Sequence, residues 1–229
     1  MQRKNLKRLI SYIILILCIP AVILLGNFVF KDKQYAFISL AVALLSCVPF
    51  FLSFEQREQN TTRLILIAVM TALSVAGRLL FSVLPGFKPV TAMVIITAMY
   101  FGSEAGFMTG ALTAVISNFY FGQGPWTPFQ MFTWGLIGLL AGLMSEQLKK
   151  SKIMLFTFGA VAGILFSLLM DIWTVLWWDD TFNFSRYGAA IISSSGYTIL
   201  YAVSNVIFLL LLAKPIGTKL ERIKDKYGI

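Results

Sequence analysis

Hydroxyl and ionisable side chains are the first candidates for chemistry, because the chain contains no histidine. Without histidine, most zinc sites and every histidine-based catalytic pair are excluded. The sequence also lacks the GxxxxGK[ST] phosphate-binding loop, so we predict that the chain does not hydrolyse ATP itself. A serine from Ser193–Ser195 acting with Asp171 is an arrangement that an intramembrane hydrolase could use, although nothing else supports it. We therefore expect no catalytic residue, no metal and no cofactor, and keep an intramembrane enzyme as an alternative.

Polar side chains spaced along apolar stretches indicate binding instead. Gln130 and Trp134 are four residues apart, so they share one helix face about a turn from each other. Asp171, Thr174 and Trp178 share a face by the same spacing rule. An amide, a carboxylate and an indole on inward faces suit a flat, heteroaromatic ligand, because they combine hydrogen bonding with a broad stacking surface.

The elements that must position these residues are membrane-spanning helices. The chain is 58% hydrophobic and 13% charged, whereas soluble domains are about a quarter charged. A span needs about 20 apolar residues. The candidate spans are Leu9–Phe30, Tyr35–Phe54, Thr62–Leu84, Pro89–Phe101, Glu104–Phe121, Thr127–Gln147, Ile153–Trp178 and Arg186–Ala213. Pro89–Phe101 is short for a crossing, so we expect it to be tilted or shielded by its neighbours. The sequence predicts an all-α membrane protein.

The most polar internal segment, EQREQNTT at 55–62, predicts a boundary between two parts. Residues 1–61 would form an N-terminal transmembrane hairpin and a polar linker. Residues 62–229 would form a six-helix membrane core with a basic cytoplasmic tail.

Basic residues predict the orientation of these spans, because Lys and Arg concentrate on the cytoplasmic side. With the N-terminus inside, 14 of the 19 Lys and Arg residues fall in inner segments, and only Lys31, Lys33, Lys88 and Arg186 fall in outer ones. Arg78 lies within a span. We therefore predict a multi-pass protein of the cell membrane with both termini cytoplasmic. A nucleic-acid partner is not expected, because the basic residues form no continuous stripe.

This topology places many intramembrane polar residues at one depth. At a rise of 1.5 Å per residue, they lie within about 15 Å of the outer surface. They are Arg78, Asn118, Gln130, Asp171 and Ser193–Ser195. Such residues normally face a bundle interior or a wet cavity, which favours a cup that opens outward. The alternative is a set of unrelated hydrogen bonds between helices.

Two further hypotheses concern individual residues at this depth. Arg78 and Asp171 could form a charge pair, because an unpaired charge there is costly; alternatively, Asp171 contacts the ligand. Gln123 and Trp126 belong to the segment FGQGPWTP at 121–128, which either closes over a ligand or forms a plain turn.

Small residues at four-residue spacing predict places where helices approach closely. The pairs are Gly106 with Gly110, Gly138 with Gly142, and Gly159 with Gly163, and a stripe comprises Ala68, Ala72 and Ala76. Packing within the protein is the expected role of most of them.

Residues 62–213 resemble the substrate-binding (S) component of an energy-coupling factor (ECF) vitamin transporter. The resemblance rests on the alanine stripe, on LPGFKPV at 84–90, on FGSEAGFMTGALTAVISNFYFGQGPWTPFQMFTWGLIGLLAG at 101–142, and on Asp171 with its tryptophan neighbours. The segment at 101–142 looks most like members assigned to cobalamin or its benzimidazole-type precursors. The two additional N-terminal helices depart from the family pattern.

The resemblance implies a six-helix cup for a vitamin or precursor, and a partnership with a transmembrane coupling subunit and two cytoplasmic ATPases. Ala68, Ala72 and Ala76 would face the coupling subunit. Gln123, Trp126, Gln130, Trp134 and Asp171 would lie at or near the ligand, together with Arg78 and Asn118 from the polar layer. A membrane scaffold of the cell envelope is the other alternative, since a scaffold needs no ligand cup.

Overall fold

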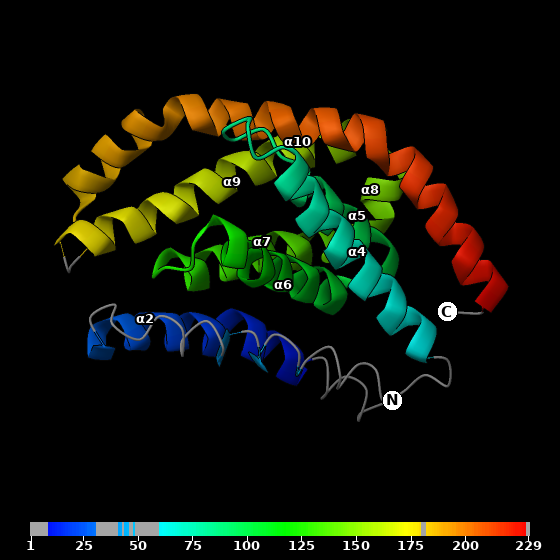
Figure 1. The fold of residues 1–229 in the computed structure, drawn as a ribbon, viewed down its shortest axis with the longest axis horizontal. Helices are drawn as coiled ribbons and strands as arrows, with labels where there is room; N and C mark the ends of the chain where they lie inside the picture. Colours follow the sequence, from blue (N-terminus) through cyan, green and yellow to red (C-terminus); the bar gives the residue numbers. More distant parts are fainter. Residues whose placement is uncertain are drawn as a thin grey trace.

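A computed structural model describes residues 9–30, 41–42, 44–45, 48, 60–179 and 182–227. Within this part of the chain the secondary structure is helical, with short connections (Figure 1). The elements are the π-helix η1 (Ile14–Cys18), α2 (Ile19–Phe30), α4 (Asn60–Leu80), α5 (Val90–Phe101), α6 (Ser103–Phe121), α7 (Trp126–Leu143), α8 (Ser145–Lys150), α9 (Lys152–Asp179) and α10 (Phe184–Tyr227).

Most helix bounds agree with the predicted spans within a few residues, but two predictions were wrong. The predicted span Thr127–Gln147 divides into α7 and α8 at Met144, whose backbone leaves the helical region at φ −99° and ψ 14°. The last helix extends beyond the predicted end at Ala213, because α10 continues through Pro215 to Tyr227. Its 44 residues correspond to about 66 Å, so α10 is longer than a bilayer core of about 30 Å.

The helices differ in length and in the share of their residues that is buried. Three described stretches are long and apolar enough to cross a membrane: Thr61–Leu80, Lys152–Trp177 and Phe184–Tyr227. By contrast, α5 has only 12 residues, and all of them except Tyr100 are buried. Figure 1 shows α5 in the middle of the assembly, with α9 and α10 side by side on one side of it. The short span is therefore shielded by its neighbours.

The predicted N-terminal hairpin falls only partly within the described residues. Its first span, Leu9–Phe30, is helical, and η1 forms a π-helical segment within it. In Figure 1, α2 lies along the side of α6 and α7 that faces away from α9 and α10. Most of its second span, Tyr35–Phe54, and the linker lie outside the described residues. The layout of six helices plus two therefore stays a prediction.

Glycines hold α6 against α7 at very short range. A Cβ atom on Gly110 would lie 2.5 Å from the carbonyl oxygen of Trp134, and one on Gly138 would lie 2.4 Å from that of Gly106. The predicted close approach is therefore confirmed, and it also joins α9 to α10, where a Cβ on Gly163 would lie 2.5 Å from the Ala202 nitrogen. These contacts determine how the polar faces of the helices are turned.

Candidate functional site

The connection between α4 and α5 is a tight turn that the sequence LPGF predicts. The Phe87 N–H donates to the Leu84 carbonyl at 3.3 Å, Pro85 occupies the second position, and Gly86 has φ +75°. These features define a type II turn, which requires glycine at its third position. A Cβ on Gly86 would also lie 2.8 Å from Leu200. The turn ends α4 at Leu80 rather than at the predicted Leu84.

The turn places the backbone of Lys88 against α10. The backbone N–H of Lys88 donates to the Ser204 hydroxyl at 3.0 Å, and that hydroxyl donates back to the Lys88 carbonyl at 3.2 Å. The rings of Phe81, Phe87 and Phe208 form a cluster beneath it, with centroids 5.0–6.1 Å apart. Two hydrogen bonds and an apolar cluster therefore determine where the Lys88 side chain begins.

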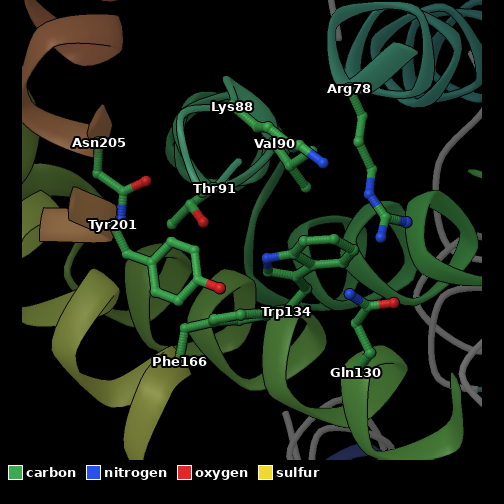
Figure 2. A pocket seen from close by; sticks show the side chains of 10 residues that line it. Arg78, Lys88, Val90, Thr91, Gln130, Trp134, Phe166, Tyr201 and Asn205 are labelled. Carbon is green, nitrogen blue, oxygen red and sulfur yellow. The ribbon is translucent and has the colours of Figure 1, made fainter. Parts of the chain in front are cut away.

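A cavity of about 90 Å³ lies between this turn and the helices α4, α5, α7, α9 and α10 (Figure 2). Its lining combines cations, amides and aromatic rings. The lining residues are Arg78, Gly86, Lys88, Val90, Thr91, Gln130, Trp134, Phe166, Tyr201 and Asn205. Figure 2 shows the indole of Trp134 between Arg78 and Gln130 on one side and Phe166 and Tyr201 on the other.

Aromatic rings form much of the cavity wall. Trp134 and Phe166 are stacked at 5.3 Å with an interplanar angle of 23°, and Tyr201 meets Phe166 edge-on at 5.2 Å. The guanidinium carbon of Arg78 lies 5.0 Å from the Trp134 ring centroid and 4.5 Å from that of Phe121. A flat ring system can stack on such a wall, and the electron-rich faces stabilise nearby cations.

Behind the wall, a buried hydrogen-bond chain joins α4, α6 and α7. Arg78 donates to the Ser117 hydroxyl and, at 2.8 Å, to Oδ1 of Asn118. Nδ2 of Asn118 in turn donates to Thr127 at 3.0 Å and to Oε1 of Gln130 at 2.9 Å. These hydrogen bonds connect the Arg78 guanidinium to the Gln130 amide on the same side of the cavity.

The cavity is rich in positive charge. Within the described part of the chain, neither Arg78 nor Lys88 forms an ion pair. The Lys88 ammonium lies 4.5 Å from the centroid of the Phe121 ring. Burial, and then the nearby Arg78 guanidinium, lower the pKa of Lys88 from its ordinary value. Both causes oppose the charged form of Lys88.

Of the seven predicted ligand-site residues, Arg78, Gln130 and Trp134 line the cavity. Asn118 does not line it, but it hydrogen-bonds two residues that do. Gln123 donates to the Val115 carbonyl at 2.8 Å, and Trp126 meets Trp173 edge-on at 6.0 Å. Neither Gln123 nor Trp126 lines the cavity, so their role at a ligand stays a prediction.

Asp171 lies outside the cavity, and its predicted charge pair with Arg78 is wrong. Its Oδ2 accepts a hydrogen bond of 2.7 Å from the Ser194 hydroxyl, while Arg78 is bound to residues of α6. A second bond, of 2.6 Å between Ser167 and Thr198, follows on the same helix pair. The polar layer therefore divides into two networks, and that of Asp171 joins α9 to α10.

Sequence reasoning missed Lys88, Phe166, Tyr201 and Asn205 as lining residues. Lys88 lies in a segment predicted to be outside the membrane, where a charged residue is ordinary and indicates no site. Asn205 is polar within a span, and that signal could have identified it. Phe166 and Tyr201 have no sequence feature that separates them from other apolar residues of a membrane helix.

The alanine stripe lies on a different face. Ala68, Ala72 and Ala76 are exposed on α4 and line an apolar groove of about 520 Å³ between α4 and α6. The groove is completed by residues such as Met108, Leu112 and Ile116. Among the residues that the structure describes, the stripe therefore lacks the close helix contacts that the glycine pairs form.

Comparison with known proteins identifies the family. A protein-family model described as "ECF-type riboflavin transporter, S component" matches residues 58–222, which include α4 to α9 and most of α10. No curated protein and no solved structure matches the chain. An S component is a substrate-binding membrane subunit that works with the coupling subunit and ATPases of an ECF module and is not itself an ATPase. The predicted ECF resemblance is confirmed at this level, whereas the riboflavin description gives no support to cobalamin. The chain belongs to the family of ECF-type riboflavin transporter S components.

Proposed function

We propose that this chain binds a flat heteroaromatic, vitamin-like molecule in the cavity and delivers it inward with the ATP-driven coupling module. The observation that carries the proposal is the composition of the cavity. It places a stacked aromatic wall, Trp134 with Phe166, beside the cation Arg78 and the amide of Gln130. Aromatic rings beside cations and amides allow one site both to stack on a small molecule and to hydrogen-bond it.

The size of the cavity and the family description together rank the candidate substrates. At about 90 Å³ the cavity is smaller than the roughly 300 Å³ at which drug-sized sites begin, so a ligand must widen it. Cobalamin, a corrinoid, would need the greatest widening. We therefore place flavins first, that is riboflavin and its derivatives, because the family description names riboflavin. A benzimidazole-type base, which the sequence suggested, comes second, and cobalamin itself last.

We further propose that the alanine-lined groove receives a helix of the coupling subunit. Small side chains let a partner backbone approach closely, and the groove lining is apolar throughout most of its length. The exposure of Ala68, Ala72 and Ala76 supports this role, because no helix of the described chain covers them.

The predicted topology gives the direction of capture. With both termini cytoplasmic, the turn that bears Lys88 faces the outside, so the substrate enters the cavity from the outer surface. The boundary near residue 61 receives support from the family match, which begins at residue 58. The N-terminal hairpin would then be an addition to the transport core.

The proposal is tested by equilibrium binding to the purified full-length protein. Riboflavin, benzimidazole bases with their ribosides, and cobalamin are titrated while tryptophan fluorescence is recorded, with thiamine and biotin as controls. Binding should quench the fluorescence, and Trp134→Ala should weaken affinity about tenfold, because a good aromatic contact contributes on the order of 1 kcal/mol beyond its buried area. Trp177→Ala is the matched control, since Trp177 is 42% exposed and does not line the cavity.

Two results would refute the ligand site. If no member of the panel binds, the cavity is not a vitamin site, and a scaffold role becomes the better account. If Gln130→Ala and Trp134→Ala both leave affinity unchanged, the ligand binds elsewhere on the protein.

A further inference from the structure

The hydrogen-bond chain behind the cavity determines which end of the Gln130 amide faces the ligand. A guanidinium only donates, so the Asn118 atom that meets Arg78 must be the carbonyl oxygen. The Asn118 amino group then faces α7 and donates to Thr127 and to Oε1 of Gln130. The oxygen of Gln130 is thereby engaged, and its amino group is left to donate into the cavity.

Three groups at this edge of the cavity are therefore donors only. Of the five N–H groups of Arg78, the bonds to Ser117 and Asn118 engage only those on Nη1. The Lys88 ammonium has donors and no acceptor, and no hydrogen bond from it is formed within the described chain. Figure 2 shows the Arg78 and Lys88 side chains both reaching toward the Trp134 ring.

The opposite edge has the reverse character. Nδ2 of Asn205 donates to the Gly159 carbonyl at 3.0 Å, which leaves its oxygen as an acceptor toward the cavity. The hydroxyls of Tyr201 and Thr91 line the same edge and can accept or donate. The cavity is thus asymmetric: the side that bears Arg78, Lys88 and Gln130 carries positive charge and donors, whereas the side that bears Asn205, Tyr201 and Thr91 is neutral and offers an amide oxygen and two hydroxyls.

We propose that the substrate of this chain carries an anionic oxygen group, a phosphate or a carboxylate, that binds between Arg78, Lys88 and the amino group of Gln130. The proposal rests on the proposed function, in that the cavity is the substrate site. A buried Arg78 and a partly buried Lys88 close together without a protein counter-charge repel each other, and aromatic faces offset only part of that cost. An anionic ligand supplies the missing negative charge and accepts hydrogen bonds from the donors at this edge. Its ring stacks on Trp134.

The test compares matched probes that differ only in charge. Riboflavin is paired with flavin mononucleotide, which adds a phosphate to the same ring, and benzimidazole is paired with benzimidazole-5-carboxylate. In the wild-type protein, the anionic member of at least one pair should bind about 10- to 100-fold more tightly, which is the usual worth of a hydrogen bond to a charged group. Using both pairs separates a phosphate site from a carboxylate site.

Two variants assign the preference to the residues named. Lys88→Met keeps the length of the side chain and removes its charge, so it should abolish most of the preference while the neutral probe still binds. Lys219→Met is the control, because Lys219 is exposed on α10, away from the cavity. Asn118→Asp gives Arg78 a negative counter-charge, and the new carboxylate accepts a hydrogen bond from the Gln130 amino group. This change turns the Gln130 oxygen into the cavity and should again lower the ratio of anionic to neutral affinity.

The outcomes distinguish the two proposals. If the neutral member of each pair binds as tightly as the anionic one, or if the preference survives Lys88→Met, the anionic site is refuted and the proposed function stands. If none of the four probes binds, the anionic site is refuted, and the ribosides and cobalamin of the larger panel decide the proposed function. A preference that Lys88→Met and Asn118→Asp each reduce, and that Lys219→Met leaves unchanged, supports the anionic site.

Discussion

Ala72 is the position at which a single substitution should separate substrate binding from transport. It lies between Ala68 and Ala76 on α4, is exposed, and lines the apolar groove of about 520 Å³. The cavity lies elsewhere, and Ala72 is not among its lining residues. We expect Ala72→Trp to leave affinity for the substrate unchanged and to block uptake.

The magnitude follows from helix geometry. A partner helix seated on small residues can approach to the lower end of the usual interaxial range of about 8–10 Å. An indole at position 72 pushes that helix toward the upper end or forces strained packing, and overpacking typically costs about 1–3 kcal/mol. The affinity for the coupling subunit should therefore fall about 5- to 150-fold.

The assay measures uptake in cells that hold the complete transporter, together with co-purification of the coupling subunit. Leu73→Trp is the matched control, because Leu73 is exposed on the same helix but does not line the groove. The docking role would be refuted by Ala72→Trp cells whose uptake equals that of the wild type. A loss of uptake that Leu73→Trp reproduces would indicate a general effect of bulk on α4.

Two further predictions concern the buried charges and the topology. Arg78→Gln and Asp171→Asn should destabilise the protein additively, within about 0.5 kcal/mol, because their partners are different residues; a coupling above about 1 kcal/mol in detergent unfolding would restore the charge pair. Cysteines introduced near Met1 and Ile229 should react with an impermeant reagent only after cells are opened, and labelling in intact cells would overturn the cytoplasmic assignment of the termini.

Local sequence patterns were sufficient to predict the helices and their closest contacts. Long apolar stretches specify helices in a membrane, because every backbone polar group must be satisfied within the segment. The glycine pairs at four-residue spacing predicted close helix approach, and the structure shows that α6 meets α7 there, with no room for a Cβ. Pro and Gly in the segment at 84–89 indicated a turn, and the structure shows that it is of type II at Leu84–Phe87.

The site was only partly predictable, because depth along a helix does not determine which way a side chain points. Arg78 and Asp171 lie within two of the long apolar helices, and their similar predicted depth suggested a pair. The rotation of α4 and α9 about their own axes instead directs Arg78 to Asn118 and Asp171 to Ser194. That rotation depends on how the helices pack against their neighbours, and it cannot be read from the period of one helix.

The sequence by itself determined that this protein is a helical membrane protein of the ECF S component type, and it identified Arg78, Gln130 and Trp134. Only the tertiary structure brought these three to one cavity and added Lys88, Phe166, Tyr201 and Asn205 to it. It also left the alanine stripe exposed while it buried the glycine contacts. The reason is that a helical period relates residues within one segment, whereas a cavity depends on distances between segments, which the packing of several helices decides together.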